Sequence, residues 1–205
     1  MNKKSHWENV YASKLADQVS WYREHLDTSL NLIMQTGVGK DAAIIDVGGG
    51  SSTLVDDLLD NGFADVAVMD ISGTAIAKSK ERLGSRSDRV DWIEADITEV
   101  ALPESHFDVW HDRAVFHFLT DAQERRKYVE LVMRSVKVGG HIIVASFGIE
   151  GPLKCSGLDV VRYSPESMHD EFGDHFTLVK SLDETHKTPF GTTQEFVYCY
   201  CRKLI

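Results

Sequence analysis

The sequence of 205 residues predicts an α/β fold, in which helices cover both faces of a seven-stranded, mostly parallel sheet that ends in an antiparallel C-terminal hairpin. Short apolar runs of strand type alternate with amphipathic helical stretches, which is the pattern of parallel strands joined by helices. The last two strand-like runs have only about a dozen residues between them, which is too few for a helical crossover. These two strands are therefore expected to pair as a hairpin.

Seven strands and four helices are predicted from these runs. The strands cover Ala43–Val47, Val66–Asp70, Val90–Ala95, Phe107–His111, His141–Phe147, Phe176–Leu182 and Glu195–Arg202. The helices cover Thr53–Asn61, Thr74–Leu83, Asp121–Val136 and Pro165–Phe172. Asp121 stands in the first turn of the third helix and a glycine pair follows its end, which are typical start and stop signals.

The composition, with 42% hydrophobic and 26% charged residues, predicts one globular domain over residues 1–205. The first 40 residues contain several aromatic side chains among helix formers, namely Trp7, Tyr11, Trp21 and Tyr22. One interpretation is a helical pair that packs these rings on the sheet. The other is a lid, residues 1–40, that closes over a core of residues 41–205 and excludes water, with Trp21 and Tyr22 facing a ligand. The sequence leaves both interpretations open.

The net charge of −10 argues against a nucleic-acid partner, because such proteins usually display a basic patch. The basic run Glu124–Lys127 is expected to be a solvated helix face. No apolar run approaches the roughly 18 to 20 residues that cross a bilayer, and the polar N-terminus lacks the apolar core of a secretion signal. We therefore expect no membrane partner and a cytoplasmic location.

Three cysteines, Cys155, Cys199 and Cys201, have neither a disulfide-framework nor a metal-ligand spacing, which is typical of a reducing compartment. The expectation is that the protein holds no metal. The oligomeric state, monomer or dimer, stays open.

A glycine triplet follows the first predicted strand and its acid, Asp46. Gly48 and Gly50 allow a positive φ and let a ligand approach the backbone without a Cβ in the way. The second strand ends in Asp70, twenty residues after Gly50, which is the spacing of a carboxylate that binds ribose hydroxyls. The two features together predict a ligand that contains adenosine.

Polar side chains also follow the third and fourth strands. After the third strand, Asp96 can accept a hydrogen bond from an adenine amino group, with Ile97 against the ring. The carboxyl ends of strands line the ligand crevice in an open α/β sheet, so residues after Val109 are expected near the reacting atoms. The candidates there are His111, Asp112, Arg113 and His117.

At these motifs the sequence resembles the class I S-adenosylmethionine-dependent methyltransferases over nearly its whole length, which implies a Rossmann-like fold and S-adenosyl-L-methionine as cofactor. The resemblance rests on Asp46–Gly50, Asp70, Asp96-Ile97 and Phe107-Asp108. It implies a cofactor site made of Trp21, Asp46, Gly48, Gly49, Gly50, Asp70, Ile71, Asp96, Ile97 and His111. Within that site, the glycine loop lies under the methionine part, Asp46 near its amino group, Asp70 at the ribose and Asp96 at the adenine. A nicotinamide dehydrogenase is disfavoured, since it would have a third glycine at Thr53.

The acceptor is predicted from the fourth strand. Asp112-Arg113, after Phe107–His111, resembles the corresponding segment of thiopurine S-methyltransferases and other small-thiol methyltransferases. The segments Lys154–Tyr163 and His186–Gly191 depart from that pattern and are similar to bacterial sulfide or methanethiol methyltransferases. The leading expectation is therefore a small-molecule acceptor, a thiol such as sulfide or methanethiol.

Methyl transfer from a sulfonium is an in-line displacement, so the enzyme aligns the groups and supplies a deprotonated nucleophile. The expected catalytic residues are His111, Asp112, Arg113, His117 and His186, and the expected substrate-binding residues are Tyr22, Arg162 and Tyr163. Structural roles compete with these: Asp112 and Arg113 as a buried ion pair, and His117 as a core histidine.

Two other functions stay open. A protein lysine methyltransferase shares the compact fold and an aromatic N-terminal segment. A cofactor-binding protein without catalysis would keep the cofactor motifs but turn over no acceptor.

Overall fold

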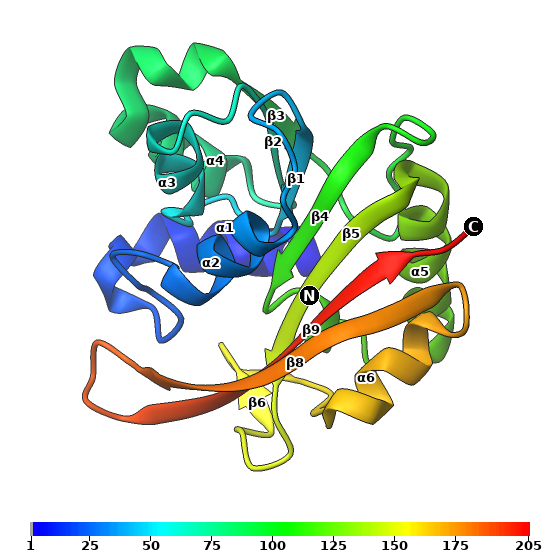
Figure 1. Cartoon of the computed structure of the whole chain (residues 1–205). Helices are drawn as coiled ribbons and strands as arrows, with labels where there is room; N and C mark the ends of the chain where they lie inside the picture. Colours follow the sequence, from blue (N-terminus) through cyan, green and yellow to red (C-terminus); the bar gives the residue numbers. More distant parts are fainter. Residues whose placement is uncertain (1) are drawn as a thin grey trace.

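The computed structural model describes residues 2–205 and contains a seven-stranded sheet in the order β3-β2-β1-β4-β5-β9-β8 (Figure 1). The first five strands in the chain run parallel, and β9 pairs antiparallel with both β5 and β8. The strands are β1 Ala43–Val47, β2 Asp65–Asp70, β3 Val90–Glu94, β4 Phe107–Arg113, β5 Val136–Phe147, β8 Phe176–Lys187 and β9 Thr193–Lys203. The predicted fold class is confirmed.

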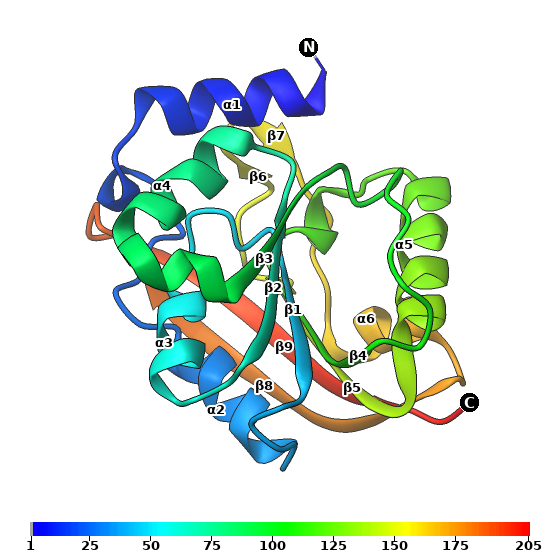
Figure 2. The ribbon, with the colours of Figure 1, turned by 90° about the horizontal axis from the view of Figure 1, so that it is seen from above.

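Helices cover both faces of the sheet (Figure 2). The α-helices are α1 Lys3–Ser13, α2 Asp27–Gln35, α3 Leu54–Asp60, α4 Gly73–Leu83, α5 Ala122–Ser135 and α6 Pro165–Phe172; the 3₁₀ turns are η1 Ala16–Gln18, η2 Gly84–Arg89 and η3 Phe116–Phe118. One apolar cluster joins the sheet to α5 and α6, and a second joins it to α2 and α3. Fully buried side chains such as Leu58 and Val132 each stabilise the fold by roughly 1.5–3 kcal/mol. No helix in residues 2–205 is long and apolar enough to cross a membrane.

Side-chain caps explain where several helices begin. The Ser72 hydroxyl accepts a hydrogen bond from the Ala75 amide at the start of α4, and the Asp121 carboxylate does the same for the Gln123 amide at the start of α5. Ser164 caps α6, and the following proline fits the first helical position. These capping residues fix the positions at which α4, α5 and α6 begin.

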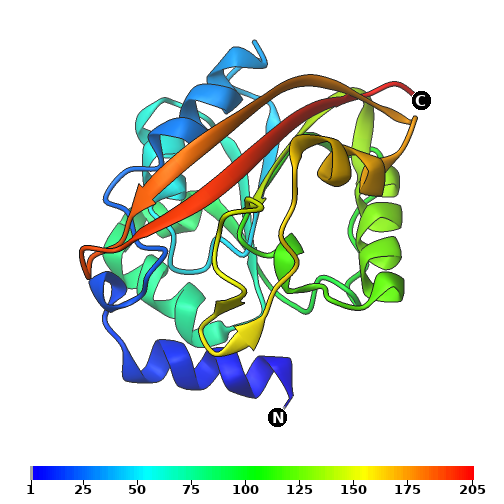
Figure 3. The same cartoon turned by 90° about the horizontal axis from the view of Figure 1, so that it is seen from below.

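Several predicted strand boundaries were wrong. β5 begins at Val136 rather than His141, because the glycine pair at 139–140 forms an irregularity within the strand instead of a loop before it. The hairpin strands β8 and β9 are longer than expected, since buried polar residues such as Glu184 and His186 hide the alternation in the sequence. A small separate hairpin that was not among the predicted strands, β6 Lys154–Cys155 with β7 Leu158–Asp159, lies between β5 and α6 (Figure 3).

The N-terminal helix α1 lies beside α4 (Figure 2). The Glu8 carboxylate accepts hydrogen bonds from the Gly73 amide at 2.7 Å and the Thr74 amide at 3.2 Å. Lys78 of α4 donates in return to the Lys14 carbonyl at 2.6 Å, directly after the C-terminal end of α1. Because the middle and the C-terminal end of α1 are both attached to α4, α1 is held across the carboxyl edge of the sheet.

Candidate functional site

A cavity with about 820 Å³ of free space opens at the carboxyl ends of β1, β2 and β4, where Val47, Asp70 and Arg113 line it. This free space includes solvent at the open mouth of the cavity. The opposite wall comes from the N-terminal segment, through Trp7 of α1 and Trp21. The cavity therefore lies at the strand ends, the edge of the sheet at which the sequence places its candidate residues.

The glycine turn after β1 forms the floor of the cavity. Gly48 has a φ of +72°, a backbone conformation that favours glycine. A Cβ built there would also lie 2.0 Å from Cγ2 of Val115, so a side chain at this position would clash as well. Gly50 does not have the positive φ expected from the sequence. It is small because a Cβ there would lie 2.7 Å from Cγ of Asp70, whose carboxylate accepts the Gly50 amide hydrogen bond at 3.0 Å.

Two acids stand at the predicted positions along the cavity wall. Asp70 is 6% exposed, accepts hydrogen bonds from the amides of Gly50 and Ser72, and retains lone pairs for hydroxyl donors. Burial raises the pKa of Asp70 to about 6. Asp96 accepts from the Thr98 amide and hydroxyl through Oδ1, beside the apolar side chains of Ile71 and Ile97. This pairing of acids with apolar walls fits an adenosine group.

A second cavity, with about 470 Å³ of free space, adjoins the first and is lined by Asp46, Gly49 and His111. Gly48, Trp21 and Arg113 are among the residues that line both cavities. Oδ1 of Asp46 lies 2.7 Å from Nδ1 of His111, within hydrogen-bond distance, whereas Oδ2 is buried with no hydrogen-bond partner in the described residues. A buried carboxylate oxygen without a partner fits the amino group of a methionine moiety.

Arg113 joins the site to the C-terminal hairpin. Its guanidinium lies 4.3 Å from the ring centroid of Phe196, 3.5 Å from Oε1 of Glu184, and donates to the Trp21 carbonyl at 3.3 Å. Arg113 therefore pairs with Glu184 and not with Asp112, the partner considered from the sequence. Successive strand residues point to opposite faces of the sheet, so Asp112 and Arg113 point away from one another.

Asp112 lies outside both cavities and is fully buried. Its carboxylate accepts hydrogen bonds from the Tyr128 hydroxyl at 2.7 Å, the Val115 amide at 2.9 Å and the Phe116 amide at 3.1 Å. Burial raises its pKa to about 6. The turn that it fixes contains Ala114, which has a φ of +73° and lines the first cavity. Asp112 thus holds the cavity wall in a strained conformation.

Gly50 and four other predicted site residues also lie outside the two cavities. His117 packs between the rings of Phe118 and Phe147, and burial lowers its pKa to about 3. His186 donates through Nε2 to the Ser20 carbonyl at 2.7 Å. Tyr163 packs on Phe116. Arg162 donates to the carbonyls of Ile149 and Gly151. Burial lowers the pKa of His186. Of the predicted substrate residues, only Tyr22 reaches a cavity.

Aromatic rings from distant segments meet at the first cavity. Trp7 lies 5.8 Å from Trp21 and 5.1 Å from Phe118 between ring centroids, and Tyr11 lies 6.3 Å from Trp21. The sequence singles out the N-terminal rings but not Phe118 or Cys155, which also line this cavity. Aromatic faces attract cations, so such a wall fits a sulfonium or an ammonium group.

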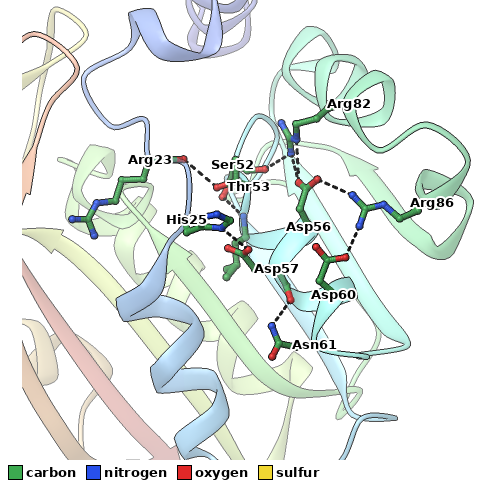
Figure 4. Close-up of polar contacts among 11 residues, drawn as sticks. Arg23, His25, Ser52, Thr53, Asp56, Asp57, Asp60, Asn61, Arg82 and Arg86 are labelled. Atoms are coloured by element: carbon green, nitrogen blue, oxygen red, sulfur yellow. Dashed lines mark hydrogen bonds and ion pairs between the residues drawn. The ribbon is translucent and has the colours of Figure 1, made fainter.

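The strap, residues 19–26, contains Trp21 of the aromatic wall, and its residues Arg23 and His25 contact the start of α3 (Figure 4). The Thr53 hydroxyl donates to the Arg23 carbonyl at 3.1 Å, and Nδ1 of His25 lies 2.8 Å from Oδ1 of Asp57. A further network of Asp56 with Arg82 and Arg86 fixes α3 against α4 and η2. The strap is thereby attached to the start of α3, which directly follows the glycine turn at the floor of the cavity.

The His25–Asp57 pair gives a pH-dependent attachment. Hydrogen bonding and attraction to the Asp57 carboxylate raise the pKa of His25 above its ordinary value. Because the folded-state pKa is raised, the pair stabilises the fold fully below the ordinary pKa of about 6.5, and this contribution is lost as pH rises through the raised value. NMR titration is expected to show this raised pKa, and Asp57→Asn should return it towards the ordinary value. An unchanged pKa in Asp57→Asn would contradict the pairing.

No group of three or more His, Cys, Asp or Glu side chains in residues 2–205 is arranged to hold a metal ion.

Comparison with known proteins gives a match between residues 45–144 and a family model described as a methyltransferase domain. Over 155 residues, the chain is 28% identical to the "eEF1A lysine and N-terminal methyltransferase" of Bos taurus, covering 73% of this chain and 22% of that protein. The chain thus spans about a fifth of the length of such relatives. It is 24% identical over 209 residues to the "EEF1A lysine methyltransferase 2" of Homo sapiens, covering 93% of this chain and 80% of that protein.

Solved structures share the fold. A structure described under "Conversion of a Disulfide Bond into a Thioacetal Group during Echinomycin Biosynthesis" has a TM-score of 0.81 at 16% identity, covering 99% of this chain and 93% of that one. The N-methyltransferase NodS from Bradyrhizobium japonicum WM9, in complex with S-adenosyl-L-homocysteine, has a TM-score of 0.72 at 15% identity, covering 96% and 97%. The chain thus shares the fold of these solved structures, and its residues 45–144 match a methyltransferase domain, which indicates S-adenosylmethionine as the cofactor.

Proposed function

We propose that this protein transfers a methyl group from S-adenosylmethionine to the side-chain amine of a lysine in another protein. The similarity to the human EEF1A lysine methyltransferase 2 carries this proposal, because it covers 93% of the chain and 80% of that relative, beyond the matched methyltransferase domain. The bovine relative also has lysine methylation in its name. These relatives favour lysine over the thiol acceptor that ranked first from the sequence.

The cofactor would be held by groups already in place around the two cavities. When bound, S-adenosylmethionine supplies an electrophilic methyl group on a sulfonium. In our proposal Asp70 accepts from the ribose hydroxyls, Asp96 from the adenine amino group and Asp46 from the methionine amino group. Ile71 and Ile97 enclose the adenine, and the glycine turn lets the methionine part lie against the backbone.

The acceptor amine would enter along the aromatic wall. The apolar stem of a lysine suits the rings of Trp7, Trp21 and Phe118, which line the cavity together. A lysine must lose its proton before it attacks, and its ordinary pKa is about 10.4. The Arg113 guanidinium disfavours a second cation nearby and so favours the neutral amine.

The N-terminal segment, residues 1–40, has the place of a lid in this proposal. Trp7 and Trp21 form one wall of the first cavity, so they exclude water from the methyl group and limit the directions from which an acceptor approaches. Alignment of this kind lowers a barrier by as much as about 7–11 kcal/mol.

A panel of acceptors tests the proposal through formation of S-adenosylhomocysteine. Purified protein is incubated with the cofactor and with eEF1A or other lysine-rich proteins, each in native form and after acetylation of its lysines. Sulfide and methanethiol form the second arm. We expect product with at least one native protein, none with its acetylated form and none with the thiols.

Two outcomes would contradict the proposal. Turnover with thiols alone would restore the small-molecule acceptor. Binding of the cofactor without turnover of any acceptor would favour the non-catalytic alternative.

A further inference from the structure

A buried chain of hydrogen bonds runs from Arg113 to Asp46 through three side chains on different elements. Tyr198 stands on β9, Ser29 on α2 and His111 on β4, and each is at most 1% exposed. The consecutive distances are 3.1 Å from Arg113 Nε to the Tyr198 hydroxyl, 3.3 Å from there to Ser29 Oγ, 2.9 Å to His111 Nε2, and 2.7 Å from Nδ1 to Asp46 Oδ1. We name these five residues the relay.

One assignment of donors satisfies every bond in the relay. A guanidinium only donates, so the Tyr198 oxygen accepts from Arg113, and in this assignment the Tyr198 hydroxyl donates to Ser29. The Ser29 hydroxyl then donates to Nε2 of the His111 ring. An imidazole nitrogen that accepts has no proton, so in this assignment the proton lies on Nδ1 and is donated to Asp46. The relay in our proposal therefore holds His111 as its Nδ1–H tautomer.

The relay affects the cofactor site because it orients the carboxylate of Asp46. One oxygen of this carboxylate is held by His111, and the other, Oδ2, is buried without a partner beside the glycine turn. A Cβ built on Gly49 would lie 2.2 Å from Oδ2, so the oxygen faces the backbone along which the methionine part of the cofactor would lie. Both Asp46 and His111 line the second cavity.

We propose that His111, Ser29 and Tyr198 are positioning residues that direct Asp46 Oδ2 at the amino group of the cofactor. The relay also ties this recognition to the strap, because the same Arg113 side chain donates to the Trp21 carbonyl. The inference concerns the cofactor and holds whichever acceptor the protein methylates.

Calorimetry with two ligands tests the proposal. S-adenosylhomocysteine carries the amino group, whereas 5′-methylthioadenosine shares its adenosine part but lacks the amino acid. We expect Ser29→Ala and Tyr198→Phe to weaken binding of S-adenosylhomocysteine by about three- to tenfold. Either change would leave Asp46 less well oriented and so weaken the one charge-assisted hydrogen bond between Asp46 Oδ2 and the amino group of the ligand. Binding of methylthioadenosine should stay unchanged in both variants.

Tyr200→Phe is the matched control. Tyr200 is also a buried tyrosine on β9, and its hydroxyl bonds to Nδ1 of His141 at 2.9 Å, outside the relay. This variant should bind both ligands as the unmodified protein does. Equal losses for both ligands in Tyr198→Phe would indicate a general structural role and overturn the proposal, as would no loss for either.

Nitrogen-15 NMR of labelled histidine gives a readout that does not depend on ligand affinity. His111 is expected to show a protonated Nδ1 and an unprotonated Nε2 in the unmodified protein. Ser29→Ala removes the donor that selects this tautomer, so a mixture of tautomers should follow. A His111 that carries its proton on Nε2 in the unmodified protein would also overturn the proposal.

Discussion

Replacing Asp70 with alanine is expected to weaken binding of S-adenosylmethionine by about 1–3 kcal/mol, or roughly 5- to 150-fold. The carboxylate lines the first cavity at the end of β2 and has lone pairs available for the ribose hydroxyls. Its removal also leaves the amides of Gly50 and Ser72 without their acceptor, which loosens the glycine turn. Isothermal titration with S-adenosylhomocysteine measures the loss.

Asp91→Ala is the control for this prediction, because Asp91 is an exposed acid on the neighbouring strand β3 and does not line the cavity. Its affinity should match that of the unmodified protein. If Asp70→Ala binds the cofactor within about twofold of the unmodified protein, which is less than 0.5 kcal/mol, the assignment of Asp70 to the ribose is refuted.

Replacing Asp112 with alanine is expected to cost about 3–5 kcal/mol of the free energy of unfolding. The change leaves three buried donors without their acceptor, the Tyr128 hydroxyl and the amides of Val115 and Phe116, and each such group costs about 1–3 kcal/mol. The loss is below the simple sum because the turn at Ala114, with its φ of +73°, is released from strain. Urea denaturation followed by circular dichroism measures the difference.

Asp159→Ala provides the matched control for stability. Asp159 pairs with Lys154 at 3.1 Å, but the two side chains are 76% and 64% exposed, so the pair contributes little. The control should lie within about 0.5 kcal/mol of the unmodified protein. A loss below about 1 kcal/mol in Asp112→Ala would show that the carboxylate does not hold the cavity wall.

The sequence predicts the parts of the site that depend on local patterns. An apolar run, an acid and a glycine triplet describe one strand and the turn after it, and Asp70 and Asp96 follow as the ends of the next two strands. Asp46, Gly48, Gly49, Asp70 and Asp96 line the cavities, since parallel strands bring their carboxyl ends to one edge of the sheet, whereas Gly50 lines neither cavity. The positive φ predicted for Gly50 was nevertheless wrong. Glycine is required there because a Cβ would meet Asp70, which lies on the neighbouring strand β2.

The sequence does not predict features that depend on contacts between distant segments. Ser29, Glu184 and Tyr198 give no local signal, yet they are the buried partners of His111 and Arg113. The thiol expectation came largely from the adjacent pair at 112–113. In the structure, Asp112 supports a turn and Arg113 pairs with the hairpin, so the pair carries little information about the acceptor.

The measurement that tests the central claim most directly is the position of the transferred methyl group. The protein is incubated with cofactor that carries a deuterated methyl group and with the native acceptor protein that supports turnover, and the digested acceptor is analysed by tandem mass spectrometry. The account predicts the deuterated methyl group on a lysine side-chain nitrogen, and no such label when the acceptor lysines are blocked. Label found only on a cysteine or on a small thiol would contradict it.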